Sequence, residues 1–295
     1  LEFRRVLFRS PLLFPAMIID FHTHIFSPDI CGDRRRAWTD RQFQRVYGDD
    51  SSTLVDHGSL MESMRAQGIV RAVAMGFPWE GEDLCAAQNE YFARVKRLSG
   101  DAIVPFGSVP VNDSVDVELW VRSIKDMGLG GIGEVGFYRE GMTPGNIRYL
   151  ERLLAAARSC ALPLCLHVNE PVGHRYAGKY DPVLGLLYET IAAFPGVPMI
   201  LSHWGGGLVF YELMPEVKRA LAHCYYDTAA TPYLYSADIY GIAARIAGPE
   251  RILFGSDYPL LQATRYLGSI DEAVPDPRWK AGILGMNAAR LLERE

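Results

Sequence analysis

Eight short apolar runs alternate with segments of helical periodicity along most of this 295-residue chain. The runs are unbroken and often β-branched, as expected of parallel strands covered on both faces. They cover Met17–Phe21, Ile69–Met75, Ile103–Val109, Gly131–Val135, Leu162–Val168, Val197–Ser202, Cys224–Thr228 and Ile252–Gly255. The segments with helical periodicity are Asp83–Leu98, Val115–Met127, Asn146–Cys160, Pro182–Phe194, Tyr211–Ala222, Ser236–Ala247 and Pro277–Leu292. This order predicts an α/β fold, the (β/α)8 TIM barrel, which typically needs about 250 residues.

A single domain is the simplest division of the chain. An open, doubly wound sheet is the competing arrangement, but no G-x-G-x-x-G sequence follows a predicted strand, which weakens a dinucleotide-binding interpretation. The sequence contains no internal repeat and no low-complexity linker. We therefore expect one barrel domain over residues 17–295, with the long connection 25–55 lying over the active-site face.

The first 16 residues do not fit this pattern. Arg9 and Pro11 interrupt their apolar stretch, whereas a signal peptide needs about 7–15 apolar residues in a row. Met17 opens the first predicted strand directly. We expect residues 1–16 to be a non-native or disordered extension.

Composition excludes several classes of partner. The formal net charge is −5, whereas a general nucleic-acid-binding protein is usually basic. No apolar run reaches the roughly 18 residues needed to span a bilayer. The five cysteines form no C-x-x-C pair, and their odd number favours reduced thiols in a cytoplasmic protein over a disulfide framework. A small-molecule substrate is the partner we expect.

Two histidines end the first predicted strand, in the segment Ile18-Ile19-Asp20-Phe21-His22-Thr23-His24. Successive side chains of a strand point to opposite faces, so His22 and His24 project on the same side. Two imidazoles on one face of a strand end can hold one metal ion.

Four more polar residues stand at the ends of predicted strands: Glu134, His167, His203 and Asp257. Each alone has an ordinary structural explanation, such as a hydrogen-bonded core histidine, a buried salt-bridge partner or a helix N-cap. Together with His22 and His24 they are all metal-ligand types, and the ends of barrel strands converge in space. Imidazole and carboxylate ligands suit zinc, manganese or iron. The pattern therefore predicts a metal centre.

These motifs resemble the amidohydrolase superfamily, in particular its amidohydrolase family 2 branch of metal-dependent barrel enzymes. The resemblance rests on IIDFHTH, LCLHVNEP, MILSHWGGG and RILFGSDYP, and it covers residues 17–292. It is specific for the superfamily and the metal site, and poorly specific for the substrate. Dimers are common in families of this kind, so a homodimer is one expected assembly.

The resemblance also implies roles for individual residues. It assigns the strand-one ligand pair to His22 and His24, and further ligands to His167, His203 and Asp257. Many superfamily members bridge two ions with a carboxylated lysine on strand four, and this chain has no lysine there.

Glu134 occupies that strand and is similar to the strand-four glutamate of TatD-like hydrolases. If Glu134 bridges, two ions are expected, the second held by His167 and His203. If Glu134 does not bridge, one ion is expected, held by His22, His24, His167 and Asp257. Zinc is the favoured ion, with manganese or iron as alternatives.

Asp257 and His203 are the expected catalytic residues. A metal ion lowers the pKa of a bound water toward about 7, and Asp257 would take the proton and pass it to the leaving group. His203 would orient the water or polarise the substrate carbonyl if it is not itself a ligand.

Residues that directly follow the strands are the expected wall of a substrate pocket. Such walls are mostly aromatic with a few polar groups. The predicted substrate-binding residues are Trp79, Arg139, His174, Arg175, Trp204 and Tyr258. Arginine in the loop after strand five could bind a substrate carboxylate in a bidentate manner, and an exposed loop charge is the equal alternative.

The favoured function is hydrolysis of an amide, ester or lactone bond in a small substrate, with a carboxylate as one expected substrate feature. The main alternative is a non-oxidative decarboxylase of an aromatic or unsaturated acid, because the same family branch includes such lyases. Many of those have a glutamate soon after the strand-six His-x-Gly, where this chain has Gly206-Gly207. A metal-binding barrel without enzymatic activity is a third hypothesis.

Overall fold

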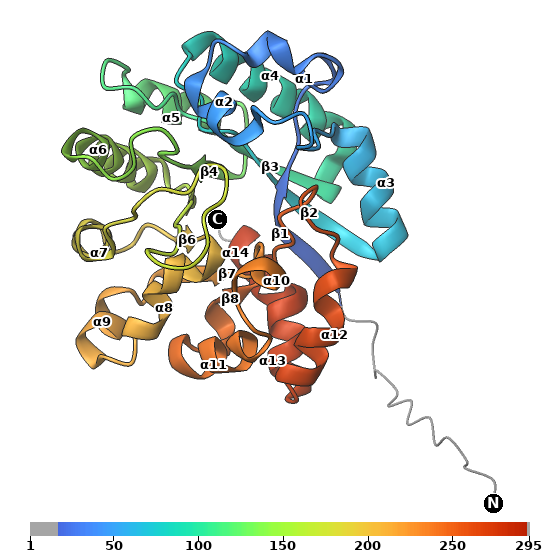
Figure 1. The fold of residues 1–295 in the computed structure, drawn as a ribbon, viewed down its shortest axis with the longest axis vertical. Coiled ribbons are helices and arrows are strands. Elements are labelled where there is room, and N and C mark those ends of the chain that lie inside the picture. Colours follow the sequence, from blue (N-terminus) through green and yellow to red (C-terminus); the bar gives the residue numbers. More distant parts are fainter. Residues whose placement is uncertain (1–16, 294–295) are drawn as a thin grey trace, which may run out of the picture.

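The computed structural model describes residues 17–293, which form an eight-stranded parallel barrel with helices around it (Figure 1). The strands pair in chain order from the first to the eighth. They are β1 Ile18–His24, β2 Ile69–Met75, β3 Ile103–Gly107, β4 Gly131–Val135, β5 Leu164–Leu166, β6 Met199–Leu201, β7 Cys224–Asp227 and β8 Ile252–Leu253. The predicted (β/α)8 fold is confirmed. The prediction for residues 1–16 lies outside the described residues.

The first and last strands meet and nearly close the barrel. The backbone N–H of Phe21 donates to the carbonyl of Phe254 at 2.7 Å, and that of Asp257 donates to the carbonyl of His22 at 2.9 Å. Ser256 binds the carboxylate of Asp20 on β1 through its backbone N–H at 2.9 Å and its hydroxyl at 2.5 Å. A Cβ at Gly255 would lie 2.6 Å from the Cβ of His22, so only glycine permits this close approach.

Helices surround the strands in chain order. They are α1 Pro28–Gly32, α2 Arg41–Tyr47, α3 His57–Gln67, α4 Glu82–Ser99, α5 Val117–Asp126, α6 Pro144–Cys160, α7 Leu184–Ala192, α8 Leu208–Tyr211, α9 Pro215–Ala220, α10 Thr231–Leu234, α11 Asp238–Ala247, α12 Thr264–Ala273, α13 Pro277–Ala281 and α14 Asn287–Leu292. Short 3-10 turns lie at Arg34–Ala37, Gly100–Ala102, His203–Gly207 and Pro249–Arg251, and a π-helical segment lies at Gly282–Met286. None of the helices within residues 17–293 has the length and apolar character that a bilayer crossing requires.

Two predicted helices are divided in the structure. The expected helix 211–222 is split between α8 and α9, because Pro215 begins α9 and cannot continue a preceding helix. The expected helix 277–292 contains the π-helical segment, where Gly285 packs against β1 so closely that a Cβ would lie 2.0 Å from the Met17 carbonyl oxygen.

The long connection 25–55 folds into α1, a 3-10 turn and α2. Phe26 and Phe43 from this segment pack with Phe77 and Trp79, which follow β2, at ring-centroid distances of 5.4–6.1 Å. This aromatic cluster anchors the connection beside the carboxyl end of the barrel.

The opposite end of the barrel interior is filled with apolar side chains. Phe21 and Phe106 meet edge to face at 5.7 Å, and Ala288 and Leu291 of α14 belong to the same buried cluster. All four are nearly or fully inaccessible to solvent. The barrel is therefore a packed core, and its polar groups gather at one end.

Candidate metal centre

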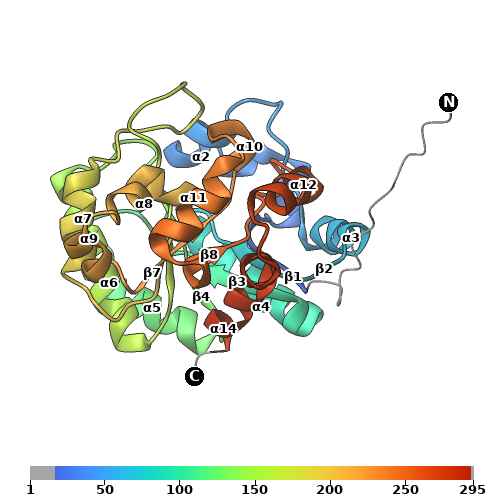
Figure 2. The same ribbon diagram turned by 90° about the horizontal axis from the view of Figure 1, so that it is seen from below.

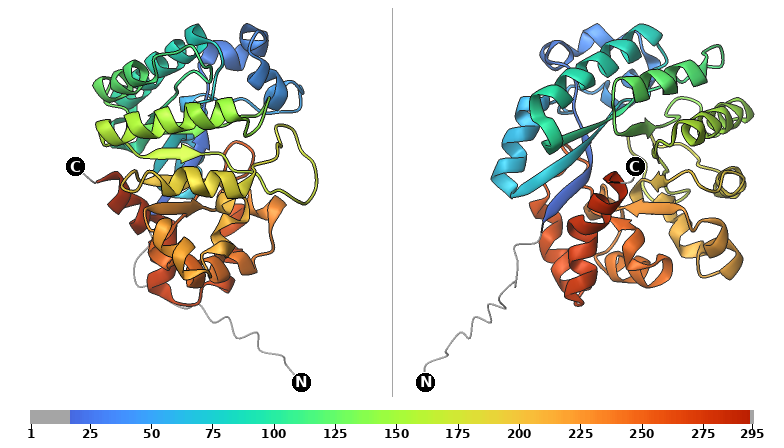
Figure 3. Two further views of the ribbon diagram at one scale, coloured as in Figure 1. Left: turned by 90° about the vertical axis from the view of Figure 1, so that its left-hand side faces the viewer. Right: turned by 180° about the vertical axis from the view of Figure 1, so that it is seen from behind.

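The predicted metal ligands lie at one end of the barrel. In Figure 2, α2, α10 and the loop after β5 gather at the end opposite α14, and the left view in Figure 3 shows that loop extending away from the red C-terminal helix. This is the end at which the strands finish, the face that carries the active site in (β/α)8 enzymes.

His22, His24 and Asp257 form the first ligand group. Nε2 of His22 lies 3.0 Å from Nε2 of His24, and Oδ1 of Asp257 lies 3.2 Å from Nε2 of His24 and 3.7 Å from that of His22. Ligand atoms that each lie about 2.1 Å from one ion are roughly 3.0–3.6 Å apart. Two of the three distances fall in this range and the third exceeds it by 0.1 Å, so the three atoms can surround a single ion.

Glu134, His167 and His203 form the second group, and all three are buried. Nδ1 of His167 lies 3.1 Å from Oε1 of Glu134 and 3.2 Å from Nε2 of His203. Nδ1 of His203 lies 3.0 Å from the carbonyl oxygen of Ala229, which can only accept. The proton of a neutral His203 is therefore on Nδ1, and Nε2 has a free electron pair that faces the centre.

Glu134 belongs to the second group and also faces the histidines of the first. Its Oε1 is 3.7 Å from Nε2 of His22 and 3.8 Å from Nε2 of His203, and its Oε2 is 3.9 Å from Nε2 of His24. Tyr138 donates to Oε2 at 3.2 Å. One carboxylate thus faces both sets of histidines.

The ionisation states of the centre follow from burial and from opposite charges. Burial alone would raise the pKa of Glu134, but His167 and His22 hold it well below its usual value. Burial likewise opposes the charge of Asp257, and His24 and His22 lower its pKa. Both carboxylates are therefore ionised at neutral pH and available as ligands.

The donor set fits a divalent cation. Imidazole nitrogens and carboxylate oxygens are the ligands of borderline ions such as zinc, manganese and iron. The buried imidazole of His22 and the partly buried imidazole of His24 face each other at 3.0 Å with ionised carboxylates beside them, an arrangement that a cation stabilises. His22, His24 and Asp257 would hold one ion, and Glu134 with His167 and His203 would hold another.

Asp227, at the end of β7, supports the centre and was not among the predicted residues. Its Oδ2 accepts from Nδ1 of His22 at 2.8 Å, and both side chains are fully buried. Its Oδ1 accepts from the backbone N–H of His203 at 2.9 Å. Burial opposes a charge on His22, but Asp227 and Glu134 raise the His22 pKa to about 10. Asp227 thus orients one histidine from each ligand group.

We expect Asp227→Asn to weaken metal binding by roughly 10–100-fold, because a carboxylate behind a ligand histidine sets its orientation and basicity. Competition with a chromophoric chelator measures the affinity. Asp126→Asn, at the exposed end of α5, is the matched control. An affinity equal to that of the wild type would show that Asp227 is not needed to position His22.

Two predicted substrate-binding residues lie in the packed interior. Trp79 and Trp204 have no exposed surface. The Trp79 indole donates to Oε1 of Gln88 at 2.5 Å, and the Trp204 indole donates to Oγ1 of Thr231 at 2.9 Å. In this conformation neither side chain presents a surface to a ligand.

The other predicted substrate-binding residues lie around the rim. Arg139 pairs with Glu80 at 2.9 Å and also with its neighbour Glu140. His174 and Arg175 are exposed in the loop after β5. Tyr258 is 8% exposed and donates to the carbonyl of Ser59 at 3.4 Å. None of these side chains has a direct polar contact with the predicted metal ligands.

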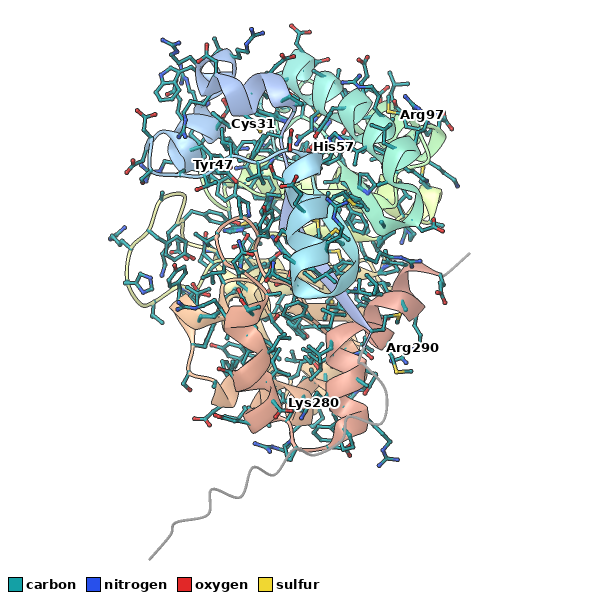
Figure 4. All side chains as sticks on the ribbon, turned by 90° about the vertical axis from the view of Figure 1, so that its right-hand side faces the viewer. Cys31, Tyr47, His57, Arg97, Lys280 and Arg290 are labelled. Carbon is teal, nitrogen blue, oxygen red and sulfur yellow. The ribbon has the colours of Figure 1, made fainter. Side chains whose placement is uncertain are left out.

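Two unpredicted residues approach the centre. Tyr47 comes from the end of α2, on the side of the molecule that also carries the loop after β5 (Figure 4). Burial and the negative charges of Asp257 and Glu134 raise its pKa. Asn169 lies 2.9 Å from Nε2 of His167 through its amide nitrogen. Asn169 stands inside the LCLHVNEP motif, and Tyr47 lies in the connection 25–55 that was expected over the active-site face.

A search of curated proteins found a local match only. A lipoyl synthase from Anaeromyxobacter dehalogenans is 37% identical over 71 residues, which is 24% of this chain and 24% of that protein. The chain thus spans about a quarter of the relative's length, and the match carries no function to this chain.

Solved structures with the same fold cover nearly the whole chain. A 5-carboxyvanillate decarboxylase from Sphingomonas paucimobilis superposes with a TM-score of 0.72 at 15% identity, over 95% of this chain and 100% of that one. A 5-carboxyvanillate decarboxylase from Novosphingobium aromaticivorans, complexed with manganese, has a TM-score of 0.72 at 14% identity, over 94% and 96%. A protein named amidohydrolase II has a TM-score of 0.65 at 20% identity, over 94% and 100%.

The sequence profile described as Amidohydrolase matches residues 19–294. This range includes strands β2 to β8, all of β1 except Ile18, and every residue of both ligand groups. The family and the ligand groups together support a divalent metal in an enzyme. The chain belongs to the amidohydrolase family.

Proposed function

We propose that this protein is a metal-dependent hydrolase that cleaves an amide, ester or lactone bond in a small molecule. The observation that carries the proposal is the position of Glu134, whose oxygens lie 3.7–3.9 Å from histidine nitrogens of both ligand groups. A carboxylate shared by two ligand groups favours a site for two neighbouring ions, an arrangement that stabilises both the attacking and the leaving oxygen in hydrolysis.

Zinc is the proposed ion, because the ligands are nitrogen and oxygen atoms in a buried site. Manganese and iron use the same ligand types, and manganese is the ion named for the Novosphingobium decarboxylase. When bound, such ions supply a nucleophile at neutral pH and polarise the scissile carbonyl.

Asp257 is the proposed proton carrier. Its carboxylate is ionised, and its backbone has a φ of 64° in the turn after β8, which directs Oδ1 toward His24. It takes a proton at Oδ1 or Oδ2 and passes it to the leaving group. His203 is the second proposed catalytic residue. Burial opposes its charge, but Asp257 and Glu134 raise its pKa. In a site where Nε2 of His203 holds no ion, a protonated His203 can donate from Nε2 to the substrate carbonyl.

A decarboxylase is the second candidate function. The similarity to the two 5-carboxyvanillate decarboxylases over nearly the whole chain favours it. The same ligand groups would then hold an ion that binds the substrate carboxylate.

One preparation tests both functions. The protein loaded with zinc, and separately with manganese, is assayed against 4-nitrophenyl esters, lactones and anilides, and against aromatic acids including 5-carboxyvanillate and 2,6-dihydroxybenzoate with detection of carbon dioxide. We expect metal-dependent hydrolysis that a chelator abolishes and re-added metal restores. Brisk carbon dioxide release without hydrolysis would replace the hydrolase with the lyase.

A further inference from the structure

Glu170 is a buried carboxylate near the metal centre with one oxygen free. The residue is 8% exposed and follows β5 in the sequence Asn169-Glu170-Pro171. Oε2 accepts from the hydroxyl of Tyr176 at 3.1 Å. Oε1 is buried and has no hydrogen-bond partner within residues 17–293. An unpaired buried oxygen destabilises the folded state, more so when it is charged, so its persistence points to a ligand or an ordered water.

No cationic side chain of the described residues pairs with this carboxylate. The one lysine of the same loop, Lys179, donates instead to the carbonyls of Val172 and His174 at 2.6 and 2.9 Å. Arg139, on the loop after β4, pairs with two other glutamates. A buried negative charge normally has a cation or several donors beside it, and Glu170 has two phenols beside it, Tyr176 as the donor to Oε2 and Tyr235.

A chain of hydrogen bonds connects Glu170 to the centre. The Asn169 amide nitrogen lies 2.9 Å from Nε2 of His167 and donates to the hydroxyl of Tyr176 at 2.8 Å. Tyr176 in turn donates to Glu170. Glu170 therefore lies within the length of a small molecule from the metal ligand His167.

Loops from two further strands complete the surroundings. Gly206, after β6, packs on Asn169 so closely that a Cβ would lie 2.1 Å from its carbonyl oxygen. Tyr235, after α10, lies against Glu170: burial first, and then the charge of Glu170, raise the pKa of this phenol. Glu170 is thus enclosed by loops that follow three consecutive strands of the catalytic face.

This environment suits an ammonium group. An ammonium has three N–H donors and no acceptor, a carboxylate binds it through charge-assisted hydrogen bonds, and aromatic rings beside it add a favourable cation–π contribution. A substrate carboxylate at the same place would be repelled by Glu170.

We infer that Glu170 determines specificity by binding an ammonium group of the substrate while the scissile bond lies at the metal ligands. The inference rests on the proposed function, because it assumes that a substrate spans these two places. It differs from the substrate carboxylate expected from the sequence, since the buried unpaired charge in the structure is negative, and Arg139 and Arg175 lie on the rim.

Binding of simple probes tests the inference without turnover. The zinc-loaded protein is titrated with benzylammonium and with benzyl alcohol, which has a similar shape and no charge, and ligand-observed NMR gives each Kd. We expect the wild type to prefer benzylammonium by about tenfold or more, as a charge-assisted hydrogen bond of the size known in proteins implies. Glu170→Gln should abolish the preference and leave the affinity for benzyl alcohol unchanged.

Two further variants make the test independent of folding effects. Glu216→Gln on the exposed side of α9 is the matched control and should keep the full preference. Tyr235→Phe should reduce the preference in the wild-type background and have no further effect in the Glu170→Gln background. The inference would be overturned if the wild type and Glu170→Gln bound benzylammonium with equal affinity, or if the wild type bound neither probe. An ordered water would then be the partner of Oε1. Failure of the ester, lactone and anilide assays with the Glu170-dependent preference intact would remove the hydrolase proposal alone.

Discussion

Asp257→Asn is expected to lower kcat/KM by roughly a thousandfold or more, because one substitution removes both a proton carrier, worth about 10²–10⁴-fold, and a charged ligand. The backbone of Asp257 has a φ of 64°, a left-handed conformation that asparagine tolerates better than most residues. The amide has nearly the same shape as the carboxylate, so the barrel should fold normally. Steady-state kinetics on the best substrate of the panel measure the loss.

Asp126→Asn provides the control, since it makes the same chemical change on the exposed end of α5. Metal content and circular dichroism establish that each variant is folded and loaded. If the loaded Asp257→Asn variant retained turnover within tenfold of the wild type, Asp257 would be neither the proton carrier nor an essential ligand.

Glu134→Gln is expected to change the number of ions bound. If both oxygens of Glu134 serve the two ligand groups, the wild type holds two ions per chain and the variant holds about one, because a neutral amide does not compensate two cations. Turnover should fall by roughly 100-fold or more, since a two-ion clamp contributes several kcal/mol to the transition state. Elemental analysis of dialysed protein gives the stoichiometry.

Glu134→Gln also tests whether the site holds one ion instead of two. Tyr138→Phe removes only the phenol that donates to Oε2 of Glu134, so it should retain the wild-type stoichiometry and serves as the control. One ion per chain in both the wild type and Glu134→Gln would show that Glu134 is a supporting residue of a single-ion site.

The barrel could be predicted from the sequence because buried parallel strands appear in it as short apolar runs. The predicted and observed bounds of β2 and β4 coincide. The predicted ligands could be placed for the same reason: a polar residue that ends such a run must lie at the carboxyl end of the barrel, as His22 and Asp257 do.

The missed features depend on contacts between distant segments. Trp79 follows a strand, as a pocket residue would, but its neighbours Phe43 and Gln88 bury it. Asp227 ends an apolar run in the same way as the predicted ligands, yet its partner is 205 residues away in sequence. Short helices such as α1 and α10 have too few residues to show a 3.6-residue period.

The seam between β1 and β8, where the first and last strands meet and nearly close the barrel, has a consequence for the order of folding. Asp20 and Ser256, which hold it, are 236 residues apart in the sequence, so the loop that must close is almost as long as the domain, and its closure is among the slowest contacts to form. The first ligand group straddles this seam, with two histidines on one side and an aspartate on the other. A chain still emerging from the ribosome therefore cannot assemble that ligand group until its last strand has been made. Binding of a cation to this ligand group would then stabilise the folded barrel at the last stage of folding, by the free energy of metal binding.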